Sequence, residues 1–196
     1  DVYRGQRGRL EAVITLRGRA SHGAQPELGE NALYRAARLL EELEKLSTKL
    51  RDDPVLGRGT LVASDLECAT PSRNAVPDRA RIYVDRRLTR GETPEEALAQ
   101  LRALPGLRLE GDAADVDAEA DTVEVVRFET EAWTGRKVEQ EKIFPTWLVE
   151  EDHELVDLAR SSVEEVLGRR PRIGCWAFST NGVATMGRFG IPTVGF

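Results

Sequence analysis

The sequence of 196 residues predicts an α+β protein built around one antiparallel sheet. Four segments alternate apolar and polar residues as strands do, and two others place apolar residues at helical spacing. Their order along the chain is strand, helix, strand, strand, helix, strand. In this split βαβ pattern both helices cover one face of the sheet. We therefore expect a ferredoxin-like βαββαβ domain over residues 1–136.

The first strand and the first helix are expected between residues 9 and 45. Arg9–Leu16 alternates and contains β-branched residues, and Gly18 ends the pattern. A helix is expected from Asn31, with apolar residues along one side and charged residues along the other. The inward residues are expected to be Leu33, Ala36, Ala37, Leu40 and Leu43, and the outward ones Arg35, Arg38, Glu41, Glu42 and Lys45.

The next two strands are expected to be joined by the turn at residues 70–74. The second strand is predicted at Thr60–Ala69 and the third at Ala80–Leu88. Side chains of a strand point alternately to its two faces. One face of the third strand therefore carries Ile82 and Val84, and the other carries Tyr83, Asp85 and Arg87.

The second helix is expected to begin at Thr93, because Thr93 and Glu96 can form a capping box with Pro94 at the first helical position. The fourth strand is expected at Val123–Trp133. Between them, the acidic run Gly111–Asp121 is interpreted as a solvated loop, because it lacks the glycine and the closing glutamate of a calcium-binding loop. The buried side of the second helix is expected to be Ala97, Leu98, Leu101 and Leu104.

Residues 137–196 are expected to form an incomplete α/β segment. So short a piece buries too little surface to be stable alone, so we expect it to belong to a larger sheet. The chain also begins without methionine and ends in an apolar run, which favours a fragment of a longer protein. The expected elements are a connection at 142–147, a helix from the cap Asp152 to Gly168, a strand at Arg172–Trp176, a brief helix after Thr180 and a strand at Thr193–Phe196. The inward residues of the longer helix are expected to be Leu155, Leu158, Ala159, Ser162 and Val166.

Composition narrows the classes of function. A net charge of -6 argues against a general nucleic-acid binder, which needs a basic surface. No segment approaches the roughly 18 apolar residues of a membrane span, and the first residues lack an apolar signal core, so no membrane association is expected. The two cysteines, Cys68 and Cys175, lie in predicted strands and are interpreted as buried, reduced thiols. This favours a cytoplasmic location.

The two histidines do not form a metal site or a catalytic triad by themselves. Zinc sites usually show a close pair of histidines or cysteines, and none is present. His153 is interpreted as a solvated residue at the start of a helix. Ser21 and His22 are adjacent, and adjacent side chains on an extended chain point in opposite directions. The sequence therefore predicts no self-contained catalytic apparatus.

Three motifs could nevertheless carry chemistry. His22 lies among small residues that allow another molecule to approach, and an imidazole can donate a hydrogen bond to a developing oxyanion. The alternative is a plain loop histidine. Asn74 and Arg87 could together hold a carboxylate, because arginine presents a planar fork and asparagine adds a donor. The alternative is a surface pair between Asp85 and Arg87.

The third motif precedes the short helix expected near the C-terminus. Ser179, Thr180 and Asn181 could use hydroxyls and free backbone N–H groups to hold an anionic or carbonyl oxygen. The alternative is a simple helix cap.

Taken in order, SHGAQPELGENAL, NAVPDRARIYVDRR and FSTNGVATMGRFGIPTVGF resemble the dinuclear zinc amidohydrolases that include acetylornithine deacetylase, succinyl-diaminopimelate desuccinylase and carboxypeptidase G. The resemblance covers nearly the whole chain. The first two motifs match the S-H-[GS]-x-x-P segment and the N-x-[IV]-P turn followed by D-x-R. Ser179, Thr180 and Asn181 replace the usual residues of the family's G-T-S-D-type loop. The resemblance implies a lid, or dimerisation, domain followed by part of a catalytic domain.

The resemblance also implies roles for these residues. His22 would reach from the lid of one subunit to the scissile carbonyl in the neighbouring subunit of a homodimer, and Asn74 and Arg87 would hold the substrate's carboxylate. The substrate would be an N-acyl amino acid or a small peptide. Two zinc ions would be bound by residues outside positions 1–196, so we expect this chain alone to be inactive. The competing hypothesis is a stand-alone ferredoxin-like module for ligand sensing or protein interaction.

Overall fold

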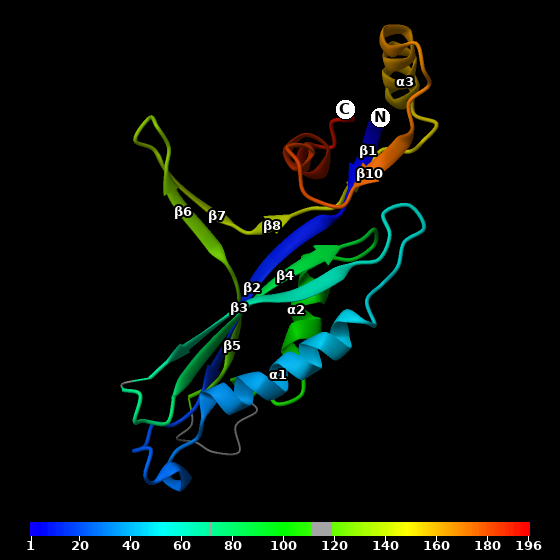
Figure 1. Ribbon diagram of the computed structural model, residues 1–196. Coiled ribbons are helices and arrows are strands. Elements are labelled where there is room, and N and C mark those ends of the chain that lie inside the picture. The colour runs from blue at the N-terminus through cyan, green and yellow to red at the C-terminus, as the bar shows by residue number, and fades with distance from the viewer. Residues whose placement is uncertain (71, 111–118) are drawn as a thin grey trace.

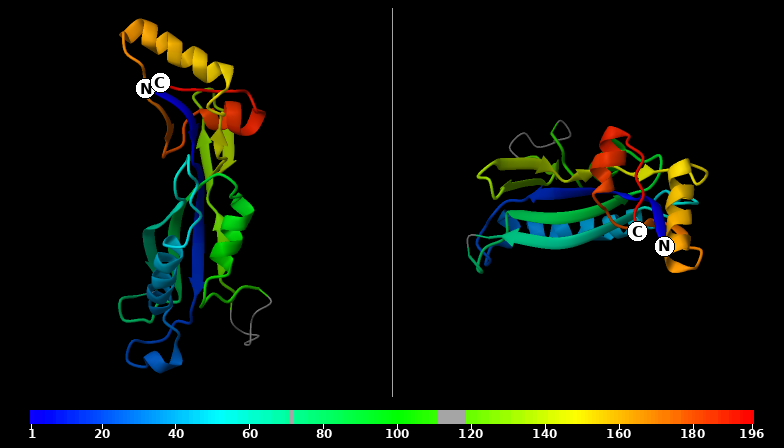
Figure 2. Two further views of the ribbon diagram at one scale, coloured as in Figure 1. Left: turned by 90° about the vertical axis from the view of Figure 1, so that its right-hand side faces the viewer. Right: turned by 90° about the horizontal axis from the view of Figure 1, so that it is seen from above.

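The protein is elongated, with two lobes joined along its length (Figures 1 and 2). The computed structural model describes residues 1–70, 72–110 and 119–196. The larger lobe contains the antiparallel sheet and the two helices expected within residues 1–136, and it is called the lid below. The second lobe contains both termini and most of the C-terminal segment. The α+β fold predicted from the sequence is confirmed.

The lid sheet has the strand order β3-β4-β2-β5, with every neighbouring pair antiparallel. This is the order expected of a ferredoxin-like domain. The helices α1 and α2 pack on the same face of this sheet (Figure 2). The bounds are Gly8–Arg17 for β2, Ala32–Ser47 for α1, Thr60–Ala69 for β3, Arg79–Leu88 for β4, Pro94–Arg102 for α2 and Thr122–Val125 for β5.

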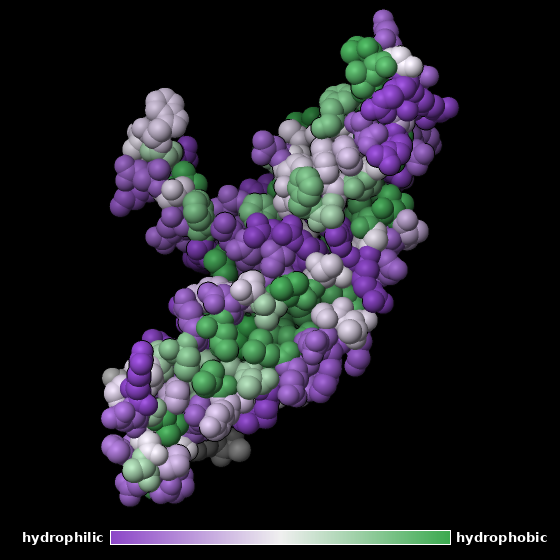
Figure 3. Space-filling view, in the orientation of Figure 1, coloured by the Kyte–Doolittle hydropathy of each residue, from purple (hydrophilic) through white to green (hydrophobic). Residues whose placement is uncertain are grey.

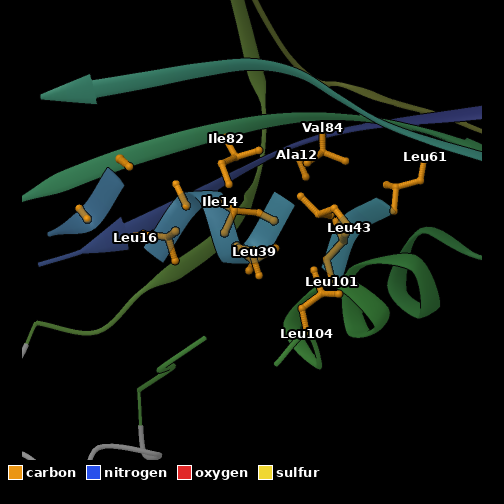
Figure 4. Close-up of a cluster of buried hydrophobic side chains, with 14 of the residues drawn as sticks. Ala12, Ile14, Leu16, Leu39, Leu43, Leu61, Ile82, Val84, Leu101 and Leu104 are labelled. Carbon is orange, nitrogen blue, oxygen red and sulfur yellow. The ribbon is translucent and has the colours of Figure 1, made fainter. Parts of the chain in front are cut away.

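The lid core lies between the sheet and the two helices (Figure 4). The alternation predicted for β4 is confirmed, because Ile82 and Val84 are buried while Tyr83 and Asp85 are partly exposed. Each fully buried Leu, Ile or Val contributes roughly 1.5–3 kcal/mol to folding, so this cluster is the main source of the lid's stability. Its labelled members are Ala12, Ile14, Leu16, Leu39, Leu43, Leu61, Ile82, Val84, Leu101 and Leu104.

The helix α1 begins where predicted, but it turns a different face to the core. Asn31 is its N-cap and accepts hydrogen bonds from the backbone N–H groups of Leu33 and Tyr34 at 2.9 and 3.2 Å. The expectation that Leu33 and Ala37 face inward is wrong, since both are exposed. The expectation that Arg35 faces outward is also wrong. The buried face consists of Ala32, Arg35, Ala36, Leu39 and Leu43.

Arg35 is buried because it forms an ion pair with Asp121, whose side chain is fully buried. The guanidinium donates to the Asp121 carboxylate at 2.6 and 3.0 Å and to the carbonyl of Gly106 at 2.8 Å. Asp121 also accepts from the backbone N–H groups of Arg17 and Arg108, both at 2.8 Å. The interpretation of the acidic run as a solvated loop is therefore wrong for Asp121, and residues 111–118 lie outside the described residues.

The helix α2 begins as predicted. The Thr93 hydroxyl accepts from the N–H of Glu96 at 3.1 Å, and the Glu96 carboxylate accepts from the N–H of Thr93 at 3.0 Å. Pro94 occupies the first helical turn. This reciprocal capping box satisfies two N–H groups that a helix start leaves without intrahelical partners.

The segment predicted as one strand at Val123–Trp133 is two strands. β5 belongs to the lid sheet, whereas β6 (Arg127–Glu131) pairs with β7 (Lys137–Glu141) in a two-stranded hairpin that projects from the lid. Arg136, at which we expected the lid domain to end, lies in the turn of this hairpin. After the hairpin, β8 (Ile143–Phe144) pairs with β2, so the expected connection returns to the lid sheet.

The second lobe contains a small mixed sheet of order β10-β1-β9. The strand β1 (Val2–Gln6) was missed by the sequence analysis. It pairs in parallel with β10 (Ile173–Trp176) and antiparallel with β9 (Trp147–Leu148). The other elements are α3 (Glu154–Leu167), the short π-helix η2 (Val183–Arg188) and, in the lid, the 3-10 turn η1 (Pro26–Leu28).

Three details of this lobe differ from expectation. The N-cap of α3 is His153, whose Nδ1 accepts from the N–H of Leu155 at 3.1 Å, and not Asp152. Leu158 and Val166, expected to face inward, are 65% and 80% exposed, and the buried residues of α3 are Val156 and Ala159. Residues 193–196 form a single bridge, Tyr3↔Gly195, in place of the expected strand.

Both cysteines are free thiols, but they are not both buried. Cys68 is exposed, which contradicts the expectation, and Cys175 is half-buried. Removal from water raises the pKa of the Cys175 thiol. Among the helices of the described residues, none is both long and apolar enough to cross a membrane.

We predict that Asp121→Ala lowers the free energy of unfolding by about 3–5 kcal/mol. The change leaves the buried Arg35 guanidinium without its counter-charge, and it removes the acceptor of two backbone N–H groups. Urea denaturation followed by circular dichroism measures this loss. Lys45→Gln, which removes the exposed pair with Glu42, serves as control and should leave the unfolding midpoint unchanged. Equal effects of the two changes would contradict the assignment.

Candidate functional site

The loop that carries His22 is paired to the turn that carries Asn74. The two segments run antiparallel, with His22 opposite Ala75. The N–H of Gly23 donates to the carbonyl of Asn74 at 2.6 Å, and the N–H of Val76 donates to the carbonyl of Ser21 at 2.9 Å. Two motifs separated by fifty residues of sequence are therefore neighbours in the structure.

Glycine at position 23 permits this close approach. A Cβ atom there would lie 2.7 Å from the carbonyl oxygen of Asn74, which is shorter than a normal contact. The loop is also held on its other side, where Arg19 exchanges two backbone hydrogen bonds with Glu30 at 2.8 and 2.9 Å. Although His22 and Asn74 are both exposed, their backbones are fixed to one another and to the start of α1.

The His22 ring is oriented by a local hydrogen bond. The backbone N–H of Ala24 donates to Nδ1 of His22 at 3.1 Å. In a neutral imidazole one nitrogen accepts and the other carries the proton, so this bond assigns the proton to Nε2. Because the side chain is exposed, the Nε2–H group is available to donate to another molecule.

Arg87 lies at the opposite end of the lid. β2 and β4 are paired over ten consecutive positions, from Arg17↔Arg79 to Gly8↔Leu88. At about 3.3 Å per residue this ladder spans roughly 30 Å, and Arg87 is near its far end from His22. The structure therefore does not bring Asn74 and Arg87 together within one chain.

The Arg87 guanidinium forms the surface pair that the sequence analysis named as the alternative. Its Nε and Nη2 donate to the two oxygens of Asp85 at 2.7 and 3.1 Å. Asp85 also accepts from Nε of Arg9 at 2.9 Å. Burial, reinforced by the positive charge of Arg87, lowers the pKa of the neighbouring Arg7. These arginines lie at the end of the β2–β4 ladder that is next to β1, where the two lobes meet.

The Ser179–Asn181 loop is held by Gln6, a residue that the sequence analysis missed. The Oε1 atom of Gln6 accepts from the backbone N–H of Thr180 at 2.6 Å and from its hydroxyl at 2.7 Å. The Thr180 hydroxyl in turn accepts from the N–H of Gly182 at 3.2 Å. No pattern in the sequence links Gln6 to a loop 174 positions away, so only the fold could identify it.

The loop does not present the free N–H groups expected of it. Those of Thr180 and Gly182 are bonded as described, and those of Val183 and Ala184 donate to the carbonyls of Thr180 and Asn181. The expectation of free N–H groups is wrong for these four. Asn181 is exposed, and the Ser179 hydroxyl is buried without a hydrogen-bond partner among the described residues.

The six candidate residues thus form two groups at the two ends of the lid. His22 and Asn74 share the distal end, farthest from the termini (Figure 1). Arg87 and the Ser179–Asn181 loop lie at the proximal end, where Gln6 binds the loop and Arg9 pairs with Arg87. In one copy of the chain these groups are separated by the length of the β2–β4 ladder.

The residues present do not suit a zinc ion. Within the described parts of the chain, no group of three or more His, Cys, Asp or Glu side chains could hold a metal. His22 is in the distal lid and His153 caps a helix of the second lobe, so the two imidazoles cannot share an ion.

Comparison with known proteins identifies the fold and the family. Residues 4–112 match the peptidase dimerisation domain designated M20_dimer, which covers more than half of the chain. The chain belongs to the M20 peptidase dimerisation family. The resemblance seen in the sequence motifs is thereby confirmed, and the matched residues include β2, α1, β3, β4 and α2 of the ferredoxin-like lid.

The relatives extend the similarity beyond the lid. The protein YgeY of Escherichia coli K12 is 45% identical over all 196 residues, which make up 46% of its length. Acetylornithine deacetylase of Myxococcus xanthus is 31% identical over 147 residues, covering 66% of this chain and 38% of the relative. The chain thus spans less than half the length of these relatives.

A solved structure supports the same fold for both lobes. The aminopeptidase PepT of Bacillus cereus superposes with a TM-score of 0.67 at 18% identity, covering 98% of this chain and 44% of the peptidase. At this identity the likeness establishes the fold alone. It includes the second lobe as well as the M20 lid.

We predict that Gly23→Ala separates the His22 and Asn74 segments. The added methyl group must displace the Asn74 carbonyl, and such overpacking costs about 1–3 kcal/mol locally. Hydrogen exchange at the Val76 amide should accelerate by roughly tenfold or more. Gly174→Ala is the matched control, because its Cβ would meet only Tyr3 ring atoms at 3.6 Å. Unchanged protection of Val76 would show that the loop tolerates the methyl group.

Proposed function

We propose that this chain is part of a zinc-dependent hydrolase that cleaves the amide bond of an N-acyl amino acid or a small peptide. The zinc ions are expected to be held by polypeptide outside residues 1–196, as the family resemblance implies. The M20 lid supplies His22 and Asn74 to an active site that is completed by a second subunit. The observation that carries this proposal is the separation of the six candidate residues between the two ends of one chain.

The distal group suits stabilisation of an oxyanion. The Nε2–H group of His22 is exposed, and the bond from Ala24 to Nδ1 holds the ring in the donor tautomer before substrate arrives. A donor fixed in advance stabilises the developing charge without the cost of reorienting. Asn74, fixed beside His22 by the backbone pairing, adds an amide donor that can bind a neighbouring oxygen of the substrate.

The proximal group suits recognition of the substrate's carboxylate. Arg87 uses two of its five N–H donors on Asp85, which orients the guanidinium and leaves three donors for a ligand. Arg7 lies beside it and adds a second positive charge, while burial, and then the charge of Arg87, lower the pKa of Arg7. The Ser179–Asn181 loop at the same end contributes hydroxyl and amide groups.

The edge of the lid sheet suits a homodimer. β3 is one of the two edge strands of this path, and its side chains are exposed along almost its whole length, including Val62 and Leu66. The neighbouring helix α1 exposes Leu33 and Tyr34. Figure 3 shows apolar side chains gathered on the lid in this view. An unpaired, partly apolar edge strand favours pairing with a second copy about a twofold axis, which would place each distal group beside the partner's proximal group.

We predict that His22→Ala in the complete enzyme lowers turnover by roughly a hundredfold or more, because one oxyanion donor contributes about 3 kcal/mol. Zinc content should not change, since His22 is expected to bind substrate and not metal. His153→Asn, which keeps a helix-capping side chain, is the control and should retain full turnover. The assignment is refuted by a His22→Ala enzyme with normal turnover of N-acyl amino acids and small peptides.

We predict that two inactive variants restore activity when mixed. In a dimer of one His22→Ala subunit and one Arg87→Met subunit, one site receives intact His22 and intact Arg87 from opposite chains. Random exchange of equal amounts should therefore recover about a quarter of wild-type activity, since half of the dimers are mixed and each has one intact site of two. If both residues served the same site from one chain, mixing would recover nothing.

A further inference from the structure

Gln6 is a fully buried amide at the junction of the two lobes. Its backbone, at the end of β1, is paired with Trp176 on one side and Trp147 on the other. The backbone of Gln6 is therefore fixed by both neighbouring strands. It reaches across to Thr180 and accepts two hydrogen bonds there with the same oxygen, Oε1.

The chemistry of Thr180 determines how the Gln6 amide is oriented. A backbone N–H can only donate, so the atom that faces Thr180 must be the oxygen of the carboxamide. The Nε2 group then points elsewhere, and it is buried without a hydrogen-bond partner among the residues that the structure describes. Leaving such a donor unpaired carries a free-energy cost, because it loses its hydrogen bonds to water. An apolar side chain would fill this position without that cost. The feature that glutamine adds over an apolar residue here is the acceptor oxygen that binds Thr180.

The loop depends on this oxygen for its shape. Gln6 binds both polar groups of Thr180, and the Thr180 hydroxyl then binds the N–H of Gly182. On its far side Gly182 lies against the Trp147 ring, which leaves no room for a Cβ atom. Ser179 and Asn181 flank the residue that Gln6 holds, and the exposed Asn181 side chain is the one available to a ligand.

We propose that Gln6 is a positioning residue for substrate binding, acting through Thr180 to set the Ser179–Asn181 loop. The inference rests on the proposed function of the proximal group. Gln6 does not contact the reacting atoms in this assignment. It aligns the loop with the arginines at the same end of the lid, so its loss weakens binding of substrate and leaves the chemical step largely intact.

The test compares Gln6→Met with Gln6→Glu in the full-length enzyme. Methionine has a similar length but no oxygen, whereas glutamate presents an acceptor oxygen to Thr180 whether ionised or protonated. We expect Gln6→Met to raise KM about tenfold or more and to change kcat less than threefold. Gln6→Glu should restore KM to within about threefold of wild type. A purely structural role would lower the amount of active enzyme, and with it kcat, at unchanged KM.

Two further measurements separate the possible failures. Hydrogen exchange at the Thr180 and Gly182 amides should accelerate in Gln6→Met and not in Gln6→Glu, and this needs no activity. The KM increase of Gln6→Met and Thr180→Val should not add in the double variant, because both act through one contact. Additive increases, or an unchanged KM in Gln6→Met, overturn the proposal. A wild-type enzyme that hydrolyses no N-acyl amino acid or small peptide refutes the proposed function instead.

Discussion

The geometry of this protein depends on one nearly continuous extended run at the start of the chain. β1 belongs to the second lobe and β2 is a central strand of the lid, and only Arg7 separates them. Because β2 pairs with β4 over ten positions, the distance between its ends is set by backbone hydrogen bonds and not by flexible side chains. The proximal and distal groups are therefore held apart by a rigid spacer of fixed length.

The distal end of that spacer is secured by the buried ion pair of Arg35 and Asp121. Asp121 accepts from the N–H of Arg17 at the last position of β2, and Arg35 belongs to the helix that the His22 loop leads into. A buried carboxylate is tolerated here because its oxygens accept four hydrogen bonds, two of them from a guanidinium. This ion pair thus joins β2 to α1, the helix that follows the His22 loop. The backbone that carries the exposed His22 is therefore held in place.

Local chemistry made the lid predictable. The alternation of β4, the Asn31 cap and the capping box at Thr93 each depend on residues close in sequence, and all three are confirmed. The errors came from partners far away. Arg35 and Asp121 were expected to be solvated, but the fold pairs them across 86 positions. Likewise, β6 is separate from β5 because Arg127–Glu131 pairs with β7 and not with the lid sheet. Gln6 and Thr180 meet for the same reason.

A hydrogen bond donated by His22 is weak in the isolated subunit, because the side chain is exposed and water competes for its Nε2–H group. In the proposed dimer the partner's proximal lobe would cover that group and exclude water, and the same hydrogen bond then acts in a medium of lower dielectric constant. The rigid β2–β4 ladder would allow this arrangement, because it fixes the position of His22 relative to the rest of its own chain before the two subunits associate. In the proposed enzyme, dimerisation and catalysis would therefore be linked through the length of a strand, and shortening that strand by two residues would keep the lid core's facing pattern while moving His22 by roughly 7 Å.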